Sequence, residues 1–352
     1  MERNPGQLFL AGFDGLAVDA DHPVVEAVVE HGLGGVILFD RNVDGSRQNI
    51  ASPDQLRELT ATLQRFGDNA LLIAVDQEGG NVCRLRERDG FPATSPADRL
   101  AREDSTVPAA SQARIVATSL RDCGINFNLA PVVDLDCNPD NPIIGGYGRS
   151  FGADPERVAR FAREFIEAHH ALGVACCLKH FPGHGSAGAD SHLGFVDVSD
   201  RWREIELEPY RSLFAAGFTD AVMTAHVVHR GLDETGLPAT LSRRMITGLL
   251  REELGFTGVV VSDDLQMRAI TDRWSFEEAV RMAVLAGVDL LIVGNNLVRD
   301  PGAVQRGVRV VTEMVERGEL AESDLHASLA RVAELKRKIA GEVPWRNSQP
   351  TT

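Results

Sequence analysis

Eight short apolar runs, separated by longer stretches with a helical pattern, restrict the possible folds of this chain more than any other feature. The apolar residues in each run are continuous rather than alternating, which is typical of parallel strands covered on both faces. Eight such units in one chain predict the α/β class and a single (β/α)8 TIM barrel rather than an open sheet. The predicted strands are 7–13, 35–39, 71–76, 126–132, 175–180, 220–225, 258–263 and 289–294.

The stretches between these strands carry the start and stop signals of helices. Ser52-Pro53-Asp54 opens a helix that we expect to run to Phe66, with proline in the first turn, where its missing N–H costs nothing. Three further helices are expected at 154–172, 242–254 and 275–286, each followed by a glycine that can end it. Since no linker divides the chain, we expect one domain over 1–340 and a polar tail over 341–352.

The charge balance restricts the partners. The chain has 51 Asp and Glu against 36 Lys and Arg, a net charge of −15. An acidic chain repels phosphate backbones and anionic lipids, so we expect no nucleic acid and no membrane partner. The five cysteines include no C-x-x-C metal pattern, and residues 1–14 make a poor signal peptide. Both features favour a cytoplasmic protein with free thiols.

Polar side chains follow six of the eight predicted strands. In (β/α)8 barrels the chemistry lies at the C-terminal ends of the strands, and the opposite end serves stability. A chain selected only for stability would carry ordinary turn residues at these positions. We therefore predict an active site at this rim, formed from Asp76, Asp134, Lys179-His180, His226, Asp263-Asp264 and Asn295-Asn296.

The loop after the fifth strand is the most informative. It is rich in Gly, Ser and Ala, so we expect it to be mobile, and it carries three histidines. Any one of these histidines is equally well explained as a solvated surface residue. Asp190 and His192 lie two residues apart, where a carboxylate can orient an imidazole and stabilise its protonated form. That pairing suits a general acid/base.

A metal site is the alternative for the same loop. His180, His184, His192 and Asp190 include the ligand types that zinc prefers. Metal hydrolases of the amidohydrolase kind, however, begin with a His-x-His on the first strand, and residues 7–14 contain no histidine. We therefore expect no metal and no other cofactor.

Two further positions stay open on residue chemistry alone. Asp263 and Asp264 are adjacent, and adjacent residues of a strand point to opposite faces, so at most one faces the site. The other is expected to cap the next turn or to pair with a cation such as Arg268. Arg149 is equally well explained as a ligand contact or as a tie for its own loop. His169-His170 lie late in a helix pattern and are interpreted as ordinary helix residues.

Taken in order, these motifs resemble glycoside hydrolase family 3, in its single-domain β-N-acetylglucosaminidase branch. The resemblance covers roughly residues 5–297. It rests on the segments 36–39 (VILF), 75–80 (VDQEGG), 128–134 (NLAPVVD), 141–145 (NPIIG), 149–152 (RSFG), 179–185 (KHFPGHG), 190–192 (DSH), 223–226 (MTAH), 237–242 (LPATLS) and 261–267 (VSDDLQM).

The resemblance implies a retaining mechanism with Asp263 as the nucleophile and the Asp190/His192 pair as the acid/base. It also implies that four residues bind hydroxyls of the terminal sugar: Asp76, Arg149, Lys179 and His180. Two departures are visible. Residue 81 is Asn where the family commonly has Arg, and the segment 145–148 before Arg149 is longer than usual.

Together these observations predict an exo-acting β-N-acetylglucosaminidase that acts on a small-molecule glycoside, with peptidoglycan-derived fragments as the substrate class that the resemblance suggests. A family 3 β-glucosidase is the nearest alternative, but the Asp190-Ser191-His192 segment disfavours it. A GlcNAc phosphorylase could use the same residues, because a neutral His192 would not repel phosphate. A non-catalytic sugar-binding protein is disfavoured by the intact Asp263 and His192.

Overall fold

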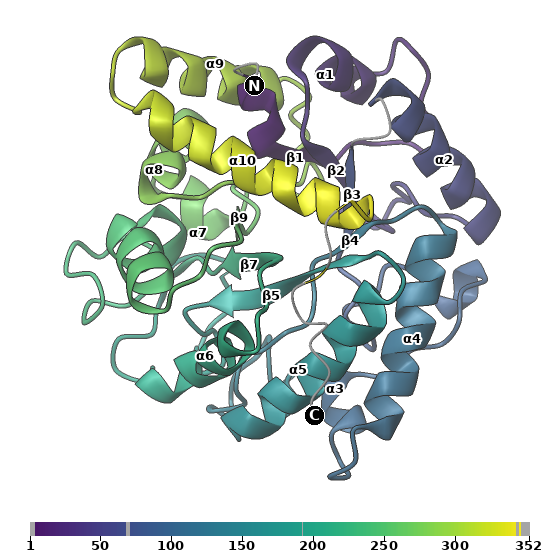
Figure 1. Ribbon diagram of the computed structural model, residues 1–352, viewed down its shortest axis with the longest axis vertical. Coiled ribbons are helices and arrows are strands. Elements are labelled where there is room, and N and C mark those ends of the chain that lie inside the picture. Colours follow the sequence, from purple (N-terminus) through teal and green to yellow (C-terminus); the bar gives the residue numbers. More distant parts are fainter. Residues whose placement is uncertain (1–3, 68–70, 192, 343–344, 346–352) are drawn as a thin grey trace.

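The computed structural model describes residues 4–67, 71–191, 193–342 and 345. Eight parallel strands form one sheet that curves into a barrel, with helices packed around it (Figure 1). The predicted (β/α)8 barrel is therefore confirmed. In sheet order the strands are β10 (Leu291–Val293), β1 (Phe9–Ala11), β2 (Gly35–Leu38), β3 (Leu72–Val75), β4 (Phe127–Asn128), β5 (Ala175–Phe181), β7 (Ala221–Thr224) and β9 (Val259–Ser262).

Hydrogen bonds between β9 and β10 close the barrel. Val261 pairs with Leu290 in a parallel bridge, and the Ser262 amide donates to the Leu290 carbonyl at 2.9 Å. All eight predicted strands are present, each within or close to its expected range. The first begins later than predicted because Pro5–Leu8 forms a short 3-10 turn, η1, which Asn4 caps through its side chain.

The helices begin and end where their caps dictate. In α5 the Asp154 side chain accepts from the Glu156 amide, and in α8 Ser275 and Glu278 form a capping box that precedes an end at Gly287, with φ of 104°. The helices are α1 (Pro23–His31), α2 (Pro53–Phe66), α3 (Ala97–Leu100), α4 (Val107–Asp122), α5 (Pro155–His170), α6 (Glu208–Ala215), η5 (Arg244–Glu253, a π-helix), α7 (Arg268–Thr271), α8 (Phe276–Ala286), α9 (Ala303–Glu316) and α10 (Glu322–Ile339). Short 3-10 turns (η2, Glu87–Asp89; η3, Glu204–Leu207; η4, Ala239–Leu241) and a two-stranded sheet (β6, Val196–Asp197; β8, Val227–Val228) complete the described elements.

Successive strand residues point alternately into the barrel and toward the helices. In β9, for example, Val259 and Val261 belong to the cluster that fills the barrel, whereas Val260 packs in the layer beneath the helices. The adjacent thiols Cys176 and Cys177 divide in the same way, and both are free and fully buried. Both faces of each of the eight barrel strands are thus covered, which is why the runs read as continuously apolar.

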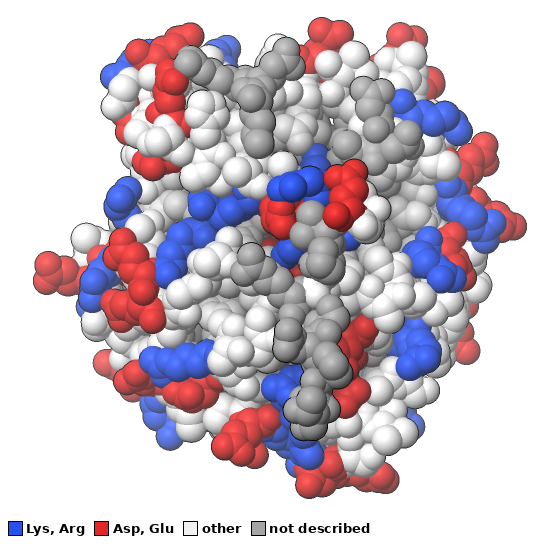
Figure 2. Space-filling model, in the orientation of Figure 1, with Lys and Arg blue, Asp and Glu red and all other residues white. Residues whose placement is uncertain are grey.

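Helix α10 closes the N-terminal end of the barrel and crosses the front of Figure 1. Its Val332 and Leu335 belong to the barrel-filling cluster. Its Lys338 donates to the carbonyl of Thr219, just before β7, at 3.0 Å. On this face acidic and basic side chains are interspersed (Figure 2). Within the described ranges no helix is both long and apolar enough to cross a membrane.

Candidate active site

The alternation along the strands brings three of the predicted site residues to the inside of the barrel. Asp76, Lys179 and Asp263 each lie two residues beyond an interior residue: Ala74, Cys177 and Val261, respectively. Asp76 and Asp263 line a pocket of about 90 Å³ at the C-terminal end of the strands. The other lining residues are Ile37, Phe39, Arg84, Leu129, Met223, Asp264, Met267, Ile292, Asn296 and Leu297.

A network of two cations and two carboxylates forms one wall of the site. Lys179 Nζ lies 2.7 Å from Asp76 Oδ1 and 2.8 Å from Glu78 Oε1. Arg149 binds Glu78 in bidentate fashion, with Nε to Oε2 at 2.8 Å and a terminal nitrogen to Oε1 at 2.7 Å. The arginine is therefore held rigidly, with its fork of donors matched to the carboxylate.

Burial and charge act in opposite directions on this network. Burial by itself would raise the pKa of Glu78, but Arg149 and Lys179 hold that pKa well below its usual value. For Lys179 burial favours the neutral amine, yet Asp76 and Glu78 raise its pKa above the ordinary value. Glu78 and Lys179 therefore stay ionised together beside Arg149, and they hold a fixed charged network behind Asp76, which lines the pocket.

His180 belongs to the same wall, and the Asp134 carboxylate orients its ring. Its Nδ1 lies 2.7 Å from Asp134 Oδ2, and its Nε2 lies 3.3 Å from a terminal nitrogen of Arg149. Because Arg149 can only donate, Nε2 accepts and Nδ1 carries the proton toward Asp134. The Asp134 carboxylate also accepts the backbone amides of His180 and His184, so it fixes the start of the loop.

The structure separates the two adjacent aspartates. Asp264 Oδ1 accepts the backbone amides of Gln266 and Gly294, both at 3.0 Å, and so caps the turn after β9 and ties it to the end of β10. Asp263 is less buried than Asp264 and continues the inward-facing alternation of β9. Of the two expected roles Asp264 thus takes the cap of the next turn, and Arg268 lies 3.4 Å from Asp272.

The loop after β5 is anchored in its first half, contrary to the expectation that all of it is mobile. Ala187 is fully buried in a small cluster with Val196, Val198, Ala225 and Val227. The Asn141 side chain donates to the carbonyls of His184 and Gly185 at 2.8 and 2.9 Å. Gly188 and Ala189 are exposed, and Asp190 is half-buried. His192 lies outside the described residues.

The other polar residues at the strand ends have structural partners. His226 is buried, with Nδ1 2.7 Å from Thr240 Oγ1 and Nε2 2.9 Å from the Asp264 carbonyl. The prediction that His226 contributes to the site is therefore wrong: its side chain is held by these two partners and does not line the pocket. Asn295 donates to the Gly12 carbonyl at 2.9 Å, whereas Asn296 lines the pocket. His169 and His170 are helix residues, as interpreted.

The two departures from the family pattern contact each other. Asn81 is exposed, and its side-chain amide donates to the backbone carbonyl of Tyr147 at 3.1 Å. Tyr147 belongs to the longer segment before Arg149. The shorter Asn81 side chain thus supports the enlarged loop at the rim.

Glu78 and Arg84 are site residues that the sequence reasoning did not single out. Glu78 forms ion pairs with both Lys179 and Arg149, and Arg84 lines the pocket with a terminal nitrogen 3.7 Å from Asp76 Oδ2. The signal for Glu78 was present in the charges, because two buried cations need more than Asp76 alone. Among the described residues, no three His, Cys, Asp and Glu side chains gather in a way that could hold a metal ion.

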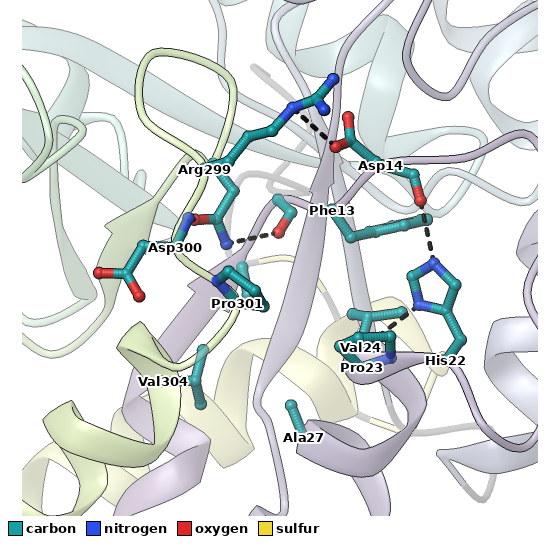
Figure 3. Close-up of a pocket in the computed structure, with 13 residues that line it drawn as sticks. Phe13, Asp14, His22, Pro23, Val24, Ala27, Arg299, Asp300, Pro301 and Val304 are labelled. Carbon is teal, nitrogen blue, oxygen red and sulfur yellow. Dashed lines mark hydrogen bonds and ion pairs between the residues drawn. The ribbon is translucent and has the colours of Figure 1, made fainter.

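A second cavity, of about 190 Å³, lies outside the barrel wall between α1 and the loop after β10 (Figure 3). Its polar lining groups already have partners. Arg299 pairs with Asp14 at 2.9 Å, Asp300 pairs with Arg306 at 2.6 Å, and both ring nitrogens of His22 make hydrogen bonds to the backbone. These groups stabilise the wall and leave no polar group arranged for chemistry.

Comparison with known proteins identifies the family that uses such a site. The sequence profile described as glycosyl hydrolase family 3 N terminal domain matches residues 2–335. The chain belongs to glycosyl hydrolase family 3. It is 40% identical over 269 residues to a β-hexosaminidase of Tolumonas auensis, a match that covers 75% of this chain and 76% of the relative.

Two further relatives are longer than this chain. β-Hexosaminidase A of Pseudoalteromonas piscicida is 32% identical over 332 residues, which cover 89% of this chain and 55% of that protein. A solved structure of a glycoside hydrolase family 3 β-N-acetylglucosaminidase from Paenibacillus sp. superposes with a TM-score of 0.87 at 37% identity, over all of this chain and 64% of that one. The chain therefore spans roughly half to two thirds of these two relatives.

Proposed function

We propose that this chain is a retaining exo-β-N-acetylglucosaminidase that removes terminal β-linked GlcNAc, with peptidoglycan-derived fragments as the substrate class. The observation that carries the proposal is the pocket itself. An inward-facing carboxylate, Asp263, shares a small pocket at the barrel rim with Asp76, beside the fixed charges of Lys179 and Arg149. The names of the relatives support N-acetylglucosamine as the sugar that is removed. The side chains of strand residues such as Ile37, Met223 and Ile292 close the bottom of the pocket, which favours the end of a sugar chain over its middle.

The terminal sugar would be held by the charged wall. Asp76 offers carboxylate oxygens, His180 offers a ring nitrogen, and Lys179 and Arg149 offer N–H donors. Glu78 holds Lys179 and Arg149 in place, and Asp134 holds His180. A cyclic polyol is recognised by such alternating donors and acceptors, because each hydroxyl can donate once and accept twice. Since the groups are held by one another, little conformational entropy is lost when the sugar binds.

Hydrolysis would proceed in two steps. Asp263 attacks the anomeric carbon and forms a glycosyl ester while the bond to the aglycone oxygen breaks, and His192 donates its proton to that oxygen. The neutral His192 then takes a proton from water, and the water oxygen attacks the anomeric carbon and releases Asp263. Asp190 would stabilise the protonated imidazole in both steps.

The cytoplasm is the proposed compartment, because free thiols suit a reducing environment.

A panel of chromogenic β-glycosides, assayed with and without phosphate, tests the proposal. We expect hydrolysis of the β-N-acetylglucosaminide, slower cleavage of the β-glucoside, and no sugar phosphate in the products. Preference for the glucoside would favour a β-glucosidase, and phosphate-dependent turnover would favour a phosphorylase. The absence of any turnover would favour a binding protein.

A further inference from the structure

A groove lined by three arginines lies at the N-terminal end of the barrel, opposite to the catalytic pocket. Its volume is about 190 Å³, and it runs between η5, the end of α8 and the first half of α10. Leu8 and Gly287, which line it, precede β1 and β10. Figure 2 shows basic side chains gathered beside α10 on this face of the molecule. We name it the basal groove and define it by its polar lining residues: Arg243, Thr247, Arg251, Asp324, Ser328 and Arg331.

Two of these arginines share a single buried carboxylate. Asp289 is fully buried, with Oδ2 2.5 Å from a terminal nitrogen of Arg251 and Oδ1 2.8 Å from a terminal nitrogen of Arg331. Oδ2 also accepts the backbone amide of Val260 at 2.8 Å, so the carboxylate is fixed to β9. One negative charge is thus divided between two guanidinium groups, and one of the two positive charges is not neutralised.

The guanidinium group of Arg251 is incompletely compensated. Besides Asp289 it contacts three backbone carbonyls at 3.2 to 3.5 Å, at or beyond the upper end of the usual hydrogen-bond range. Its Nε is buried, and no described residue accepts from it. Burial lowers the pKa of Arg251 below its ordinary value, Arg331 acts in the same direction, and Asp289 does not fully offset them. A further negative charge in the groove would therefore stabilise this cation.

Arg243 adds a third cation to the groove. It is exposed, donates to the Leu285 carbonyl at 3.4 Å, and forms no ion pair with a carboxylate of the described residues. The carboxylate that lines the groove itself is Asp324, which is exposed at the start of α10. Three arginines against Asp289 and Asp324 leave one positive charge in excess, in a chain whose net charge is −15. The basal groove is therefore a local exception to an acidic molecule.

The rest of the lining indicates the kind of anion. Ser328 Oγ accepts from Arg331 at 3.3 Å, so its O–H remains to donate beside the three guanidinium groups. Several donors around one space suit the oxygens of a phosphate, which arginine binds in bidentate geometry. Apolar side chains, among them Leu285 and Leu325, complete the lining. The volume of about 190 Å³ is several times the roughly 30 Å³ of one liquid water, so a phosphate with a substituent fits.

We propose that the basal groove binds a phosphate monoester, with the phosphate among Arg243, Arg251 and Arg331 and the substituent against the apolar lining. Such a ligand would connect η5 with α10, the helix that closes this end of the barrel. The inference goes beyond the proposed glycosidase function and does not depend on it, because the groove and the catalytic pocket lie at opposite ends of the strands. Inorganic phosphate offers the same acceptor atoms without the substituent, and the test separates the two sources.

Calorimetric titration of the full chain with phenyl phosphate and with inorganic phosphate, at constant ionic strength, tests the proposal. We expect phenyl phosphate to bind more tightly, because its ring contacts the apolar lining. Arg243→Gln should weaken its binding roughly tenfold, as the loss of one charge-assisted hydrogen bond would. Asp324→Asn should tighten its binding about twofold to fivefold, since it removes a negative charge that repels the phosphate. Both substitutions are at exposed positions and leave the buried Asp289 pairs intact.

Arg244→Gln is the matched control, because Arg244 follows Arg243 in sequence but lies 3.6 Å from Glu253 and does not line the groove. Its affinity should equal that of the wild type, and equal losses in both arginine variants would reduce the effect to general charge and overturn the proposal. Unchanged affinity in Arg243→Gln, or no binding at millimolar concentrations, would overturn it as well. Tighter binding of inorganic phosphate than of phenyl phosphate would overturn the monoester. Bound phenyl phosphate should also slow amide hydrogen exchange in η5 and α10, and slowing confined to other elements would place the ligand elsewhere.

Discussion

Glu206 is a buried carboxylate beneath the loop that carries the site residues. It lies in η3, it is 1% exposed, and its Oε1 accepts a long hydrogen bond, 3.4 Å, from the Arg203 amide. A methyl group added at Gly183 would lie 2.7 Å from Oε2, so the carboxyl group packs directly against the loop backbone. Burial raises the pKa of Glu206 from 4.5 to about 7, with the charge of Asp134 acting in the same direction and hydrogen bonds from Ser186 and Arg203 acting against it.

The raised pKa of Glu206 lowers the stability of the fold by an amount that depends on pH. Below about pH 4.5 the folded and unfolded chains both hold the proton, so Glu206 carries no penalty. Between pH 4.5 and 7 the unfolded chain loses the proton first, and stability falls by about 1.4 kcal/mol per pH unit. Above pH 7 the full loss of about 3 kcal/mol is reached. Glu206→Gln keeps the shape without the charge, so it should be stabilising by up to that amount at pH 8 and nearly neutral at pH 4.5.

Urea denaturation followed by circular dichroism at several pH values between 4.5 and 8 measures this difference. Glu204→Gln, from the same 3-10 turn but with an exposed side chain, should show no such trend. We also expect the wild-type chain to lose activity above pH 7 sooner than the Gln variant, since an ionised Glu206 disturbs the loop above it. A stability difference that stays constant with pH would refute the reasoning, because Glu206 would then be ionised and paired in the fold.

Three further predictions concern the chemistry. Asp263→Ala should abolish turnover while its denaturation curve stays close to wild type; normal activity in this variant together with loss in Asp264→Ala would reverse the assignment. Activity should be unchanged after dialysis against EDTA, and a loss that zinc restores would refute the metal-free mechanism. His192→Ala should slow cleavage of poor leaving groups about 10²–10⁴-fold more than that of activated phenols, which need no proton. Equal losses on both would make His192 a binding or structural residue.

Most of the fold was predictable because a (β/α)8 barrel repeats one local pattern. Each strand is covered on both sides, so it reads as an apolar run, and the helix caps at Ser52, Asp154 and Ser275 are local in sequence. What local reasoning missed depends on tertiary contacts. The turn at Pro5–Leu8 shortens the first strand. Ala187 anchors the loop after β5 by packing against residues of β6 and β8.

The site was predictable as a set of residue types at strand ends, but not as a set of contacts. His226 and Asp263 both follow strands and look equivalent in sequence. The structure distinguishes them, because His226 is enclosed by Thr240 and the Asp264 carbonyl while Asp263 lines the pocket. The role of Glu78 as the common partner of Arg149 and Lys179 joins positions 71 and 101 residues apart in the sequence, which no local pattern reports.

The choice between Asp263 and Asp264 depends on which strand residues face the inside of the barrel. Periodicity could not decide this, because both faces of β9 are apolar. Once Val259 and Val261 are known to fill the barrel, Asp263 continues the inward-facing alternation, whereas Asp264, although it also borders the pocket, directs Oδ1 to backbone amides. Asp264 then accepts the amides of Gln266 and Gly294, which fixes the end of β9 against β10. One carboxylate thus holds the backbone that positions the other, so the pair is better understood as a support and a reactive group than as two interchangeable acids.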